Sequence, residues 1–177
     1  MQKAKMSNYK YCPYCKEPLK RMPGGFICGA CHKKFYTNSS PAASILIVKQ
    51  GQVLLAVRGK EPKKGAYDVV GGFLELDEHP EAGITREVKE ETGLTVKIIG
   101  LLGIYIGDDY KYQGEYVHTL NLYYIGKILS GRLKANDDIS SLKWFPITKP
   151  PKMAFAHQTK LMRDLIKWYQ SSRGAGN

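Results

Sequence analysis

Apolar residues occur along the chain in short runs that are rich in β-branched side chains. Two such runs, Ala43–Val48 and Gln52–Val57, are separated by Lys49-Gln50-Gly51, and this arrangement predicts a β-hairpin. Further strands are predicted at Tyr67–Val70, Val96–Ile106, Tyr116–Leu129 and Leu142–Phe145. Most of the chain is therefore expected to form a sheet.

Two segments have the features of helices. Pro80–Thr92 has a proline in its first turn, acidic residues nearby and Gly93 as a stop signal. His157–Gln170 carries apolar residues at helical spacing, and the polar residues after it are expected to fray. Strands mixed with two helices predict an α/β domain, in which the helices pack on a mixed sheet.

A change of composition at Asn38-Ser39-Ser40-Pro41 indicates a hinge, which divides the chain into domains at 1–40 and 41–177. The length of 177 residues and the 43% hydrophobic content allow one good core with a small appendage. Apolar runs such as Ile45–Val48 are too short to cross a bilayer, and the first residues lack the apolar stretch of a secretory signal. We therefore expect a cytoplasmic protein with no membrane segment.

All four cysteines lie in the first domain, as two Cys-x-x-Cys pairs separated by twelve residues: Cys12, Cys15, Cys28 and Cys31. Four thiolates at this spacing form a tetrahedral ligand set for zinc. Two disulfides or a redox-active dithiol are the alternative interpretations. Zinc is favoured over both, because no secretion signal accompanies the cysteines and one redox pair leaves the second pair unexplained. We expect a structural Zn²⁺ without catalytic chemistry, with His32 as a bystander.

Charge is distributed unevenly. The chain has 27 Lys+Arg and 16 Asp+Glu, and residues 1–40 alone contain eight basic side chains and a single acid, Glu17. Such a segment can attract nucleic acid or simply keep the protein in solution. No base-reading motif accompanies the charge, so specific nucleic-acid binding is not the favoured interpretation.

Seven of the sixteen acids fall between Gly72 and Leu94. On a helix, Glu90 and Glu91 lie about 60° and about 40° to either side of Glu87, so the three share one sector beside the buried edge. Like charges at this spacing destabilise a helix, and a divalent cation such as Mg²⁺ or Mn²⁺ would neutralise them. A solvated acidic helix face is the alternative. The preceding glycine pair and Arg86, which can hold nearby carboxylates, favour the metal.

The order of these residues resembles the signature of a known family, the Nudix hydrolases. The box begins at Gly72, with five residues between Gly72 and Glu78 and seven residues between Glu78 and Arg86. Together with Arg86-Glu87-Val88-Lys89-Glu90-Glu91-Thr92-Gly93-Leu94, these residues fill every fixed position of the Nudix box. The resemblance covers about residues 41–170 and implies a Nudix α/β/α sandwich with a mixed sheet. The cysteine pairs ahead of it are similar to the zinc ribbon of the ADP-ribose pyrophosphatase-like and NADH pyrophosphatase-like branches.

This resemblance implies metal-dependent hydrolysis of a nucleoside diphosphate linked to another moiety, which yields a nucleoside monophosphate and the phosphorylated moiety. It also implies that Glu87, Glu90 and Glu91, with the carbonyl of Gly71, bind the catalytic Mg²⁺ or Mn²⁺. Glu78 is then an accessory carboxylate, and Arg86 orients the glutamates.

The identity of the substrate depends on weaker signals. Gly103–Tyr110 stands where NADH pyrophosphatases have a Ser-Gln-Pro-Trp-type motif, while Trp144-Phe145-Pro146 and Pro151–His157 resemble the ADP-ribose pyrophosphatase-like group. ADP-ribose or a related dinucleotide is therefore the expected substrate. Candidate substrate-binding side chains are Arg58, Tyr110 and Phe155. Tyr105 could also stack on a base, but ordinary packing is the favoured interpretation of this residue. The acids at Asp108, Asp109, Glu115 and Asp137 are equal candidates to complete the site.

Two other functions remain open. One is hydrolysis of NADH or of NAD-capped RNA, for which the basic first domain would guide the polynucleotide. The other is a non-catalytic Nudix module that senses a ligand or binds nucleic acid, although such modules usually lack part of the glutamate set. A small-molecule nucleotide is the expected partner, and a homodimer is left open.

Overall fold

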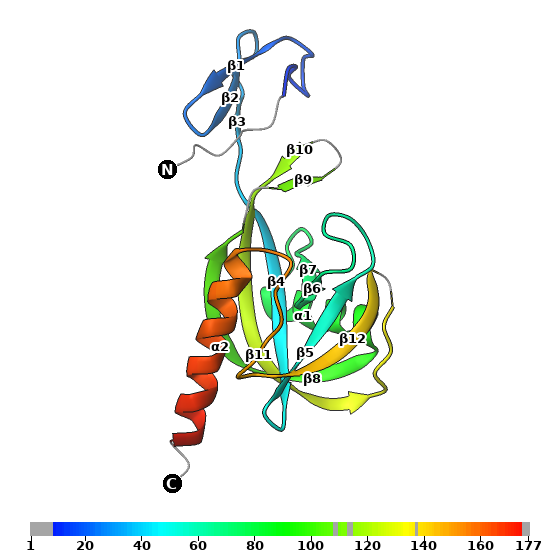
Figure 1. Ribbon diagram of the computed structural model, residues 1–177. Helices are drawn as coiled ribbons and strands as arrows, with labels where there is room; N and C mark the ends of the chain where they lie inside the picture. Colours follow the sequence, from blue (N-terminus) through cyan, green and yellow to red (C-terminus); the bar gives the residue numbers. More distant parts are fainter. Residues whose placement is uncertain (1–8, 108–109, 113–114, 137, 175–177) are drawn as a thin grey trace.

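The computed structural model describes residues 9–107, 110–112, 115–136 and 138–174, and its largest element is a seven-stranded sheet between two helices (Figure 1). The strands of this sheet are β4 (Ser40–Lys49), β5 (Gln52–Arg58), β6 (Tyr67–Asp68), β7 (Val70–Phe73), β8 (Leu94–Ile106), β11 (Thr119–Gly131) and β12 (Ile139–Pro146). Their order is β12-β5-β4-β11-β8, with β6 beside β5 and β7 beside β4. Because β11 runs parallel to β4 and antiparallel to β8, the sheet is mixed.

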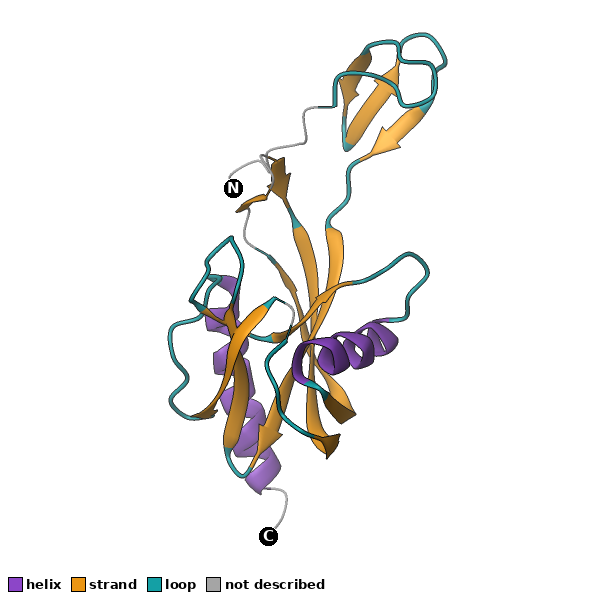
Figure 2. Cartoon of the chain, turned by 90° about the vertical axis from the view of Figure 1, so that its right-hand side faces the viewer, coloured by secondary structure: helices purple, strands orange, loops and turns teal. Residues whose placement is uncertain are grey.

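The helices α1 (Pro80–Thr92) and α2 (His157–Gly174) cover opposite faces of this sheet (Figure 2). Successive strand residues point to opposite faces, and Ile45 packs into the core under α1 whereas Leu46 packs into the core under α2. Ile84 of α1 and Leu161 of α2 are fully buried in these two layers. The predicted α/β/α sandwich with a mixed sheet is therefore confirmed.

Helix α1 has the bounds that the sequence predicts, because both of its ends are capped. At the start, Nδ1 of His79 accepts a hydrogen bond from the backbone N–H of Glu81 at 3.3 Å. At the end, Gly93 has a φ of 70° and donates its N–H to the carbonyl of Lys89. These caps fix the position of the helix turn that carries the three glutamates.

Several predicted boundaries are wrong. The strand predicted at Tyr67–Val70 is divided between β6 and β7, and three further differences concern the hairpin beside the sheet, the hinge and the last helix. The segment predicted as one strand from Tyr116 is divided between β11 and a small hairpin of β9 (Tyr110–Tyr112) and β10 (Glu115–Val117). The hinge expected at Asn38–Pro41 is shorter than predicted, because its last two residues, Ser40 and Pro41, already belong to β4 and pair with β11. Helix α2 continues to Gly174 instead of ending at Gln170. The hydroxyls of Ser171 and Ser172 donate to carbonyls one turn earlier, which keeps their polar groups within the helix.

A second, three-stranded antiparallel sheet lies beyond the start of β4, at the end of the molecule opposite the C-terminus (Figure 1). It consists of β1 (Leu19–Met22), β2 (Gly25–Cys28) and β3 (Lys34–Tyr36), and we call residues 9–36 the ribbon. Within the described part of the chain, no helix combines the length and the hydropathy that a membrane crossing needs.

The main sheet divides on one side of β4. Along its first half, Ala42–Ile45, β4 pairs with β7, and along its second half, Ile47–Lys49, it pairs with β5. Strands β6 and β7 follow each other in the chain but pair with different neighbours, so the backbone at Val69 crosses from one to the other. This crossing opens a gap in the layer of strands and sets the position of the candidate site.

Candidate functional site

Arg86 lies at the centre of a cluster of carboxylates. Its Nε and Nη2 each donate to one carboxylate oxygen of Glu78 at 2.9 Å, and its Nη1 donates to Glu87 at 2.9 Å and to Glu90 at 3.3 Å. These hydrogen bonds lower the pKa of Glu78 to about 2 and raise the pKa of Arg86. The expectation that Arg86 orients nearby carboxylates agrees with this geometry.

Glu91 is the buried member of the glutamate set, with 7% of its surface exposed. One of its carboxylate oxygens accepts the backbone N–H of Gly71 at 3.0 Å. Burial raises the pKa of Glu91 to about 8, and the charges of Glu87, Asp68 and Asp138 add to the shift. Burial also raises the pKa of Glu87, against the effect of Arg86.

The glycine pair before α1 lets the backbone approach these carboxylates closely. A Cβ on Gly72 would lie 2.5 Å from an oxygen of Glu87, so a side chain there would displace the glutamate. Gly71 has a φ of 138°, a conformation that favours glycine, and a Cβ at this position would clash with the backbone of β4. Both glycines are therefore needed where the sequence places them.

The donor set fits a hard divalent cation. Arg86 supplies one positive charge to Glu78, Glu87 and Glu90 together, and the pKa of buried Glu91 is raised because its negative charge is poorly compensated. Carboxylate oxygens are the ligands that Mg²⁺ and Mn²⁺ prefer. Glu87 and Glu90 direct no oxygen to a common point with Glu91, because they accept hydrogen bonds from Arg86 whereas Glu91 accepts one from the backbone of Gly71. Among the described residues, the oxygens of these glutamates are therefore farther apart than the sulfurs of the four cysteines, which lie within 4.8 Å of one another. Metal binding would therefore rotate these side chains.

Two adjoining cavities meet at the gap in the sheet, and we call them together the cleft. They share six lining residues: Arg58, Asp68, Val69, Gly71, Gly72 and Phe73. One cavity reaches Glu91, Lys60 and Asp138 on the side of the glutamate cluster. The other extends over the face of the sheet that α2 covers, and it is lined by Asn121, Tyr123 and Phe155. The cleft thus joins a charged end to an aromatic and amide-bearing end.

Asp68 lines both cavities of the cleft and accepts hydrogen bonds from residues on either side of it. Its Oδ2 accepts a hydrogen bond from Nη1 of Arg58 at 2.6 Å, and its Oδ1 accepts from the backbone N–H of Val69 at 2.8 Å and from Nε2 of Gln158 at 2.5 Å. Tyr123 and His157 form a further hydrogen bond of 2.9 Å at the start of α2. This network fixes the first turn of α2 against β6.

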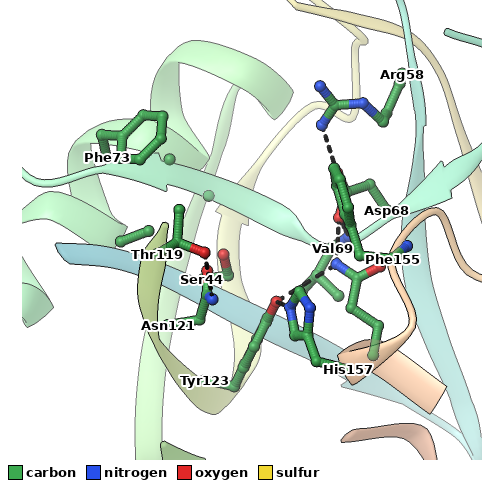
Figure 3. Close-up of a pocket in the computed structure, with 14 residues that line it drawn as sticks. Ser44, Arg58, Asp68, Val69, Phe73, Thr119, Asn121, Tyr123, Phe155 and His157 are labelled. Atoms are coloured by element: carbon green, nitrogen blue, oxygen red, sulfur yellow. Dashed lines mark hydrogen bonds and ion pairs between the residues drawn. The ribbon is translucent and has the colours of Figure 1, made fainter. Parts of the chain in front are cut away.

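Figure 3 shows the aromatic end, with Phe73 and Phe155 on opposite sides of the view and Thr119 and Asn121 below Phe73. The Phe155 ring stacks on His157 with centroids 6.0 Å apart, and the Arg58 guanidinium lies 5.3 Å from its centre. Nδ2 of Asn121 donates to Oγ1 of Thr119 at 2.8 Å, and both residues are buried. A planar, polar molecule would find ring faces and hydrogen-bonding groups in this cavity.

The structure places only some of the expected substrate-binding residues at the cleft. Arg58 and Phe155 both line the cleft. Tyr105 does not line it: it is buried between Tyr123 and α2, where its hydroxyl donates to Asp164 at 2.8 Å, so the packing interpretation holds. The candidate acids Asp108, Asp109 and Asp137 and the side chains of Tyr110 and Glu115 lie outside the described residues.

Sequence reasoning does not identify several residues of the cleft: Asp68, Asn121, Asp138 and Gln158. Asn121 is a polar residue within an apolar strand, which is a signal that could have singled it out. Asp138 has no local feature that distinguishes it from its neighbour Asp137. Asp68 and Gln158 are 90 residues apart in the chain, and nothing local in the sequence indicates that they meet.

The four cysteines of the ribbon form a compact cluster. All four sulfurs lie within 4.8 Å of one another, and the thiols are free, with Cys12 Sγ 3.7 Å from Cys31 Sγ and Cys15 Sγ 3.4 Å from Cys28 Sγ. Four sulfurs at tetrahedral Zn–S bonds would be about 3.8 Å apart, so the cluster fits zinc. The backbone N–H of Cys31 donates to the sulfur of Cys28, which lowers the pKa of that thiol to about 6 and favours the thiolate.

Comparison with known proteins gives a consistent set of relatives. A model of the NUDIX domain matches residues 38–169. An ADP-ribose pyrophosphatase from Methanocaldococcus jannaschii is 36% identical over 138 residues, which is 77% of this chain and 79% of that protein. NAD-capped RNA hydrolase NudC from Vibrio atlanticus is 28% identical over 82% of this chain, but the chain spans only 52% of that protein. This chain thus covers about half the length of the NudC relatives it matches.

Among solved structures, a NUDIX hydrolase from Nitrosomonas europaea superimposes with a TM-score of 0.72, at 23% identity, over 96% of this chain and 94% of that one. A UDP-X diphosphatase superimposes with a TM-score of 0.64, at 24% identity, over 78% of this chain and 66% of that one. At these identities the superpositions concern the fold.

The raised pKa of Glu91 predicts a pH dependence of stability in metal-free protein. The folded state keeps the Glu91 proton up to about pH 8, whereas the unfolded state loses it near the ordinary value of 4.5. Stability should therefore fall as the pH rises through this window, because the folded state binds more protons there. Glu91→Gln should remove this part of the fall and raise the melting temperature at pH 8 by about 2–4 °C or more. A Glu91→Gln melting curve with the wild-type slope against pH would contradict this account.

The cysteine cluster predicts one zinc ion per chain in the purified protein. Cys28→Ser should reduce the zinc content measured by mass spectrometry to near zero and expose the ribbon to proteolysis, because a segment of this size depends on the metal for its fold. The matched control is His32→Ala, a neighbouring exposed residue that should leave the zinc content unchanged. Zinc lost equally from both variants would show that the sulfurs alone do not bind it.

Proposed function

This chain belongs to the Nudix family of pyrophosphate-bond hydrolases, and from that premise we propose that its substrate is ADP-ribose or a closely related dinucleotide. One water molecule would be consumed and one P–O–P bond broken, so that ADP-ribose yields AMP and ribose 5-phosphate. The observation that carries this proposal is the cleft, which joins Glu91, the buried member of the glutamate cluster, at one end to the Phe155 and Asn121 cavity at the other. A nucleotide with its diphosphate at the charged end and its base at the aromatic end matches this arrangement.

The proposed ligands of the catalytic Mg²⁺ or Mn²⁺ are Glu87, Glu90 and Glu91, with the carbonyl of Gly71. The surplus of negative charge around Arg86 and the burial of Glu91 support this assignment. When bound, the metal would polarise the diphosphate and lower the pKa of the attacking water. Before the metal binds, Arg86 would hold Glu87 and Glu90 beside the site, and Glu78 would anchor Arg86 through its two hydrogen bonds.

The proposed base-binding site is the cavity between Phe73 and Phe155. The Phe155 ring would stack on the adenine, and the amide of Asn121 would offer hydrogen-bonding groups to the edge of the base. Arg58 is held by Asp68 and by the carbonyl of Pro62, so it would present its guanidinium toward the diphosphate in a fixed orientation. Lys60 forms an ion pair with Asp138 near the same end and would add positive charge there.

The ribbon is proposed as the core of a structural zinc domain that comprises residues 1–40, followed by the hydrolase domain from residue 41 to residue 177. The four clustered sulfurs, the separate three-stranded sheet and the start of the matched NUDIX domain at residue 38 support this division. No reacting group is assigned to the ribbon.

A substrate panel tests the proposal. Purified protein with Mg²⁺ or Mn²⁺ should hydrolyse ADP-ribose faster than NADH, diadenosine polyphosphates or UDP-glucose, as followed by chromatography of the products. Reaction in ¹⁸O-labelled water then identifies the phosphorus that is attacked. Faster turnover of NADH would favour the NADH pyrophosphatase alternative, and a lack of turnover of every diphosphate would favour the ligand-sensing module.

The metal ligands are tested by neutral, isosteric substitution. Glu87→Gln, Glu90→Gln and Glu91→Gln should each lower kcat for ADP-ribose by at least about 100-fold, because each removes a charge that holds the cation. The control is Glu81→Gln, which changes an exposed acid in the first turn of the same helix and should keep kcat within about twofold. Near wild-type turnover in all three variants would reject the assignment.

The base site is tested by the balance between KM and kcat. Phe155→Ala should raise KM for ADP-ribose roughly tenfold, since stacking on a base contributes about 1–3 kcal/mol, with a smaller effect on kcat. Phe155→Trp keeps an aromatic face and should restore most of the affinity. A KM that does not change in Phe155→Ala would place the base elsewhere.

A further inference from the structure

Aromatic and basic side chains gather on one face of the three-stranded ribbon. The register of its strands aligns Arg21, Phe26 and Phe35 side by side across β1, β2 and β3. Paired residues of neighbouring strands point to the same face, so these three side chains form a row. The Arg21 guanidinium lies 5.9 Å from the centre of the Phe26 ring, which agrees with this placement.

Two tyrosines extend this row outward into solvent. Tyr9 packs edge-on against Phe26 with centroids 5.8 Å apart, and Tyr14 lies 6.0 Å from Phe35 at a tilt of 32°. Both tyrosines nevertheless remain open, with 61% and 67% of their surface exposed. The Nζ of Lys33 lies 3.7 Å from the centre of the Tyr14 ring. We call these six residues the ribbon face.

The surrounding charge is almost entirely positive. The described ribbon carries Lys10, Lys16, Lys20, Arg21, Lys33 and Lys34, against Glu17 as its one acid. Exposed rings beside cations are the arrangement that binds unpaired bases and the phosphates between them. Charge alone would fit a solubility role, but it gives no reason for tyrosines of this exposure to lie beside Arg21 and Lys33.

We propose that the ribbon face binds single-stranded nucleic acid, with bases stacked on Tyr9 and Tyr14 and phosphates beside Arg21 and Lys33. This inference does not depend on the proposed substrate, because it concerns binding outside the cleft. The two sites are close along the chain. The ribbon ends at Tyr36, and Ala42 already lines the cleft, so the backbone between them spans at most roughly 20 Å. A strand held on the ribbon face would thus lie beside the hydrolase domain.

The test measures binding of an oligonucleotide that the cleft cannot hydrolyse. Full-length protein is titrated into a fluorescein-labelled, mixed-sequence 12-nucleotide RNA that has a 5′-hydroxyl and no diphosphate, and anisotropy is recorded at several KCl concentrations. The wild-type protein should bind, and log K should fall linearly with log[KCl] with a slope of about −0.7 per phosphate contacted. The corresponding single-stranded DNA and the RNA duplex are measured in parallel.

Tyr14→Ala and Tyr36→Ala form a matched pair. Tyr36 has 65% of its surface exposed, but it follows Phe35 in β3, and strand alternation points it to the opposite face of the small sheet. Tyr14→Ala should weaken binding roughly tenfold, whereas Tyr36→Ala should stay within about twofold of wild type. Lys33→Gln should reduce the salt slope by about 0.7. Zinc content and ADP-ribose turnover, measured for each variant, verify that the fold is kept.

The outcomes separate this inference from its alternatives. Binding of RNA alone, or of RNA and DNA single strands equally, supports it and defines the preferred sugar. Equal loss of affinity in Tyr14→Ala and Tyr36→Ala, no loss in either, or duplex binding as tight as single-strand binding would overturn it, because each result indicates attraction by charge without stacking. Failure of ADP-ribose hydrolysis in the wild-type protein would leave the binding result unaffected.

Discussion

The site depends on one constraint: its glutamate carboxylates carry more negative charge than the single guanidinium of Arg86 can compensate. Arg86 contacts Glu78, Glu87 and Glu90, and the remaining glutamate, Glu91, is buried against a backbone N–H instead of a cation. Burying a carboxylate in this way destabilises the charged form, which the raised pKa of Glu91 records. A folded protein keeps such a group where its function needs it, and coordination of a divalent cation is the function that this chemistry supports.

The division of the sheet gives these charges access to a ligand. Strand β4 pairs with β7 along its first half and with β5 along its second half. The backbone between β6 and β7 therefore crosses the gap at Val69, and the Gly71-Gly72 pair can approach α1. Residues from both faces of the sandwich then line one cleft: Glu91 comes from the helix on one side, and Phe155 from the segment before the helix on the other.

The parts of this account that the sequence could predict are those set by local rules. The bounds of α1 follow from its proline, its caps and Gly93, and the common sector of the glutamates follows from helix geometry alone. The aromatic end of the cleft could not be predicted in this way, since Asp68 meets Gln158, and Tyr123 meets His157, only after the sheet and α2 have packed. The same holds for the ribbon face, where strand register brings Arg21, Phe26 and Phe35 together. Tyr105 is the opposite case, because the interpretation that the sequence favours for it, packing in the core, agrees with its burial.

The central claim, that the glutamates of α1 bind a divalent cation, is tested most directly by anomalous diffraction from crystals soaked in manganese. The account predicts an anomalous peak in contact with carboxylate oxygens of Glu87, Glu90 and Glu91, with the side chains of Glu87 and Glu90 rotated from their hydrogen bonds to Arg86. A soaked crystal with full manganese occupancy elsewhere and no peak beside these three residues would contradict it.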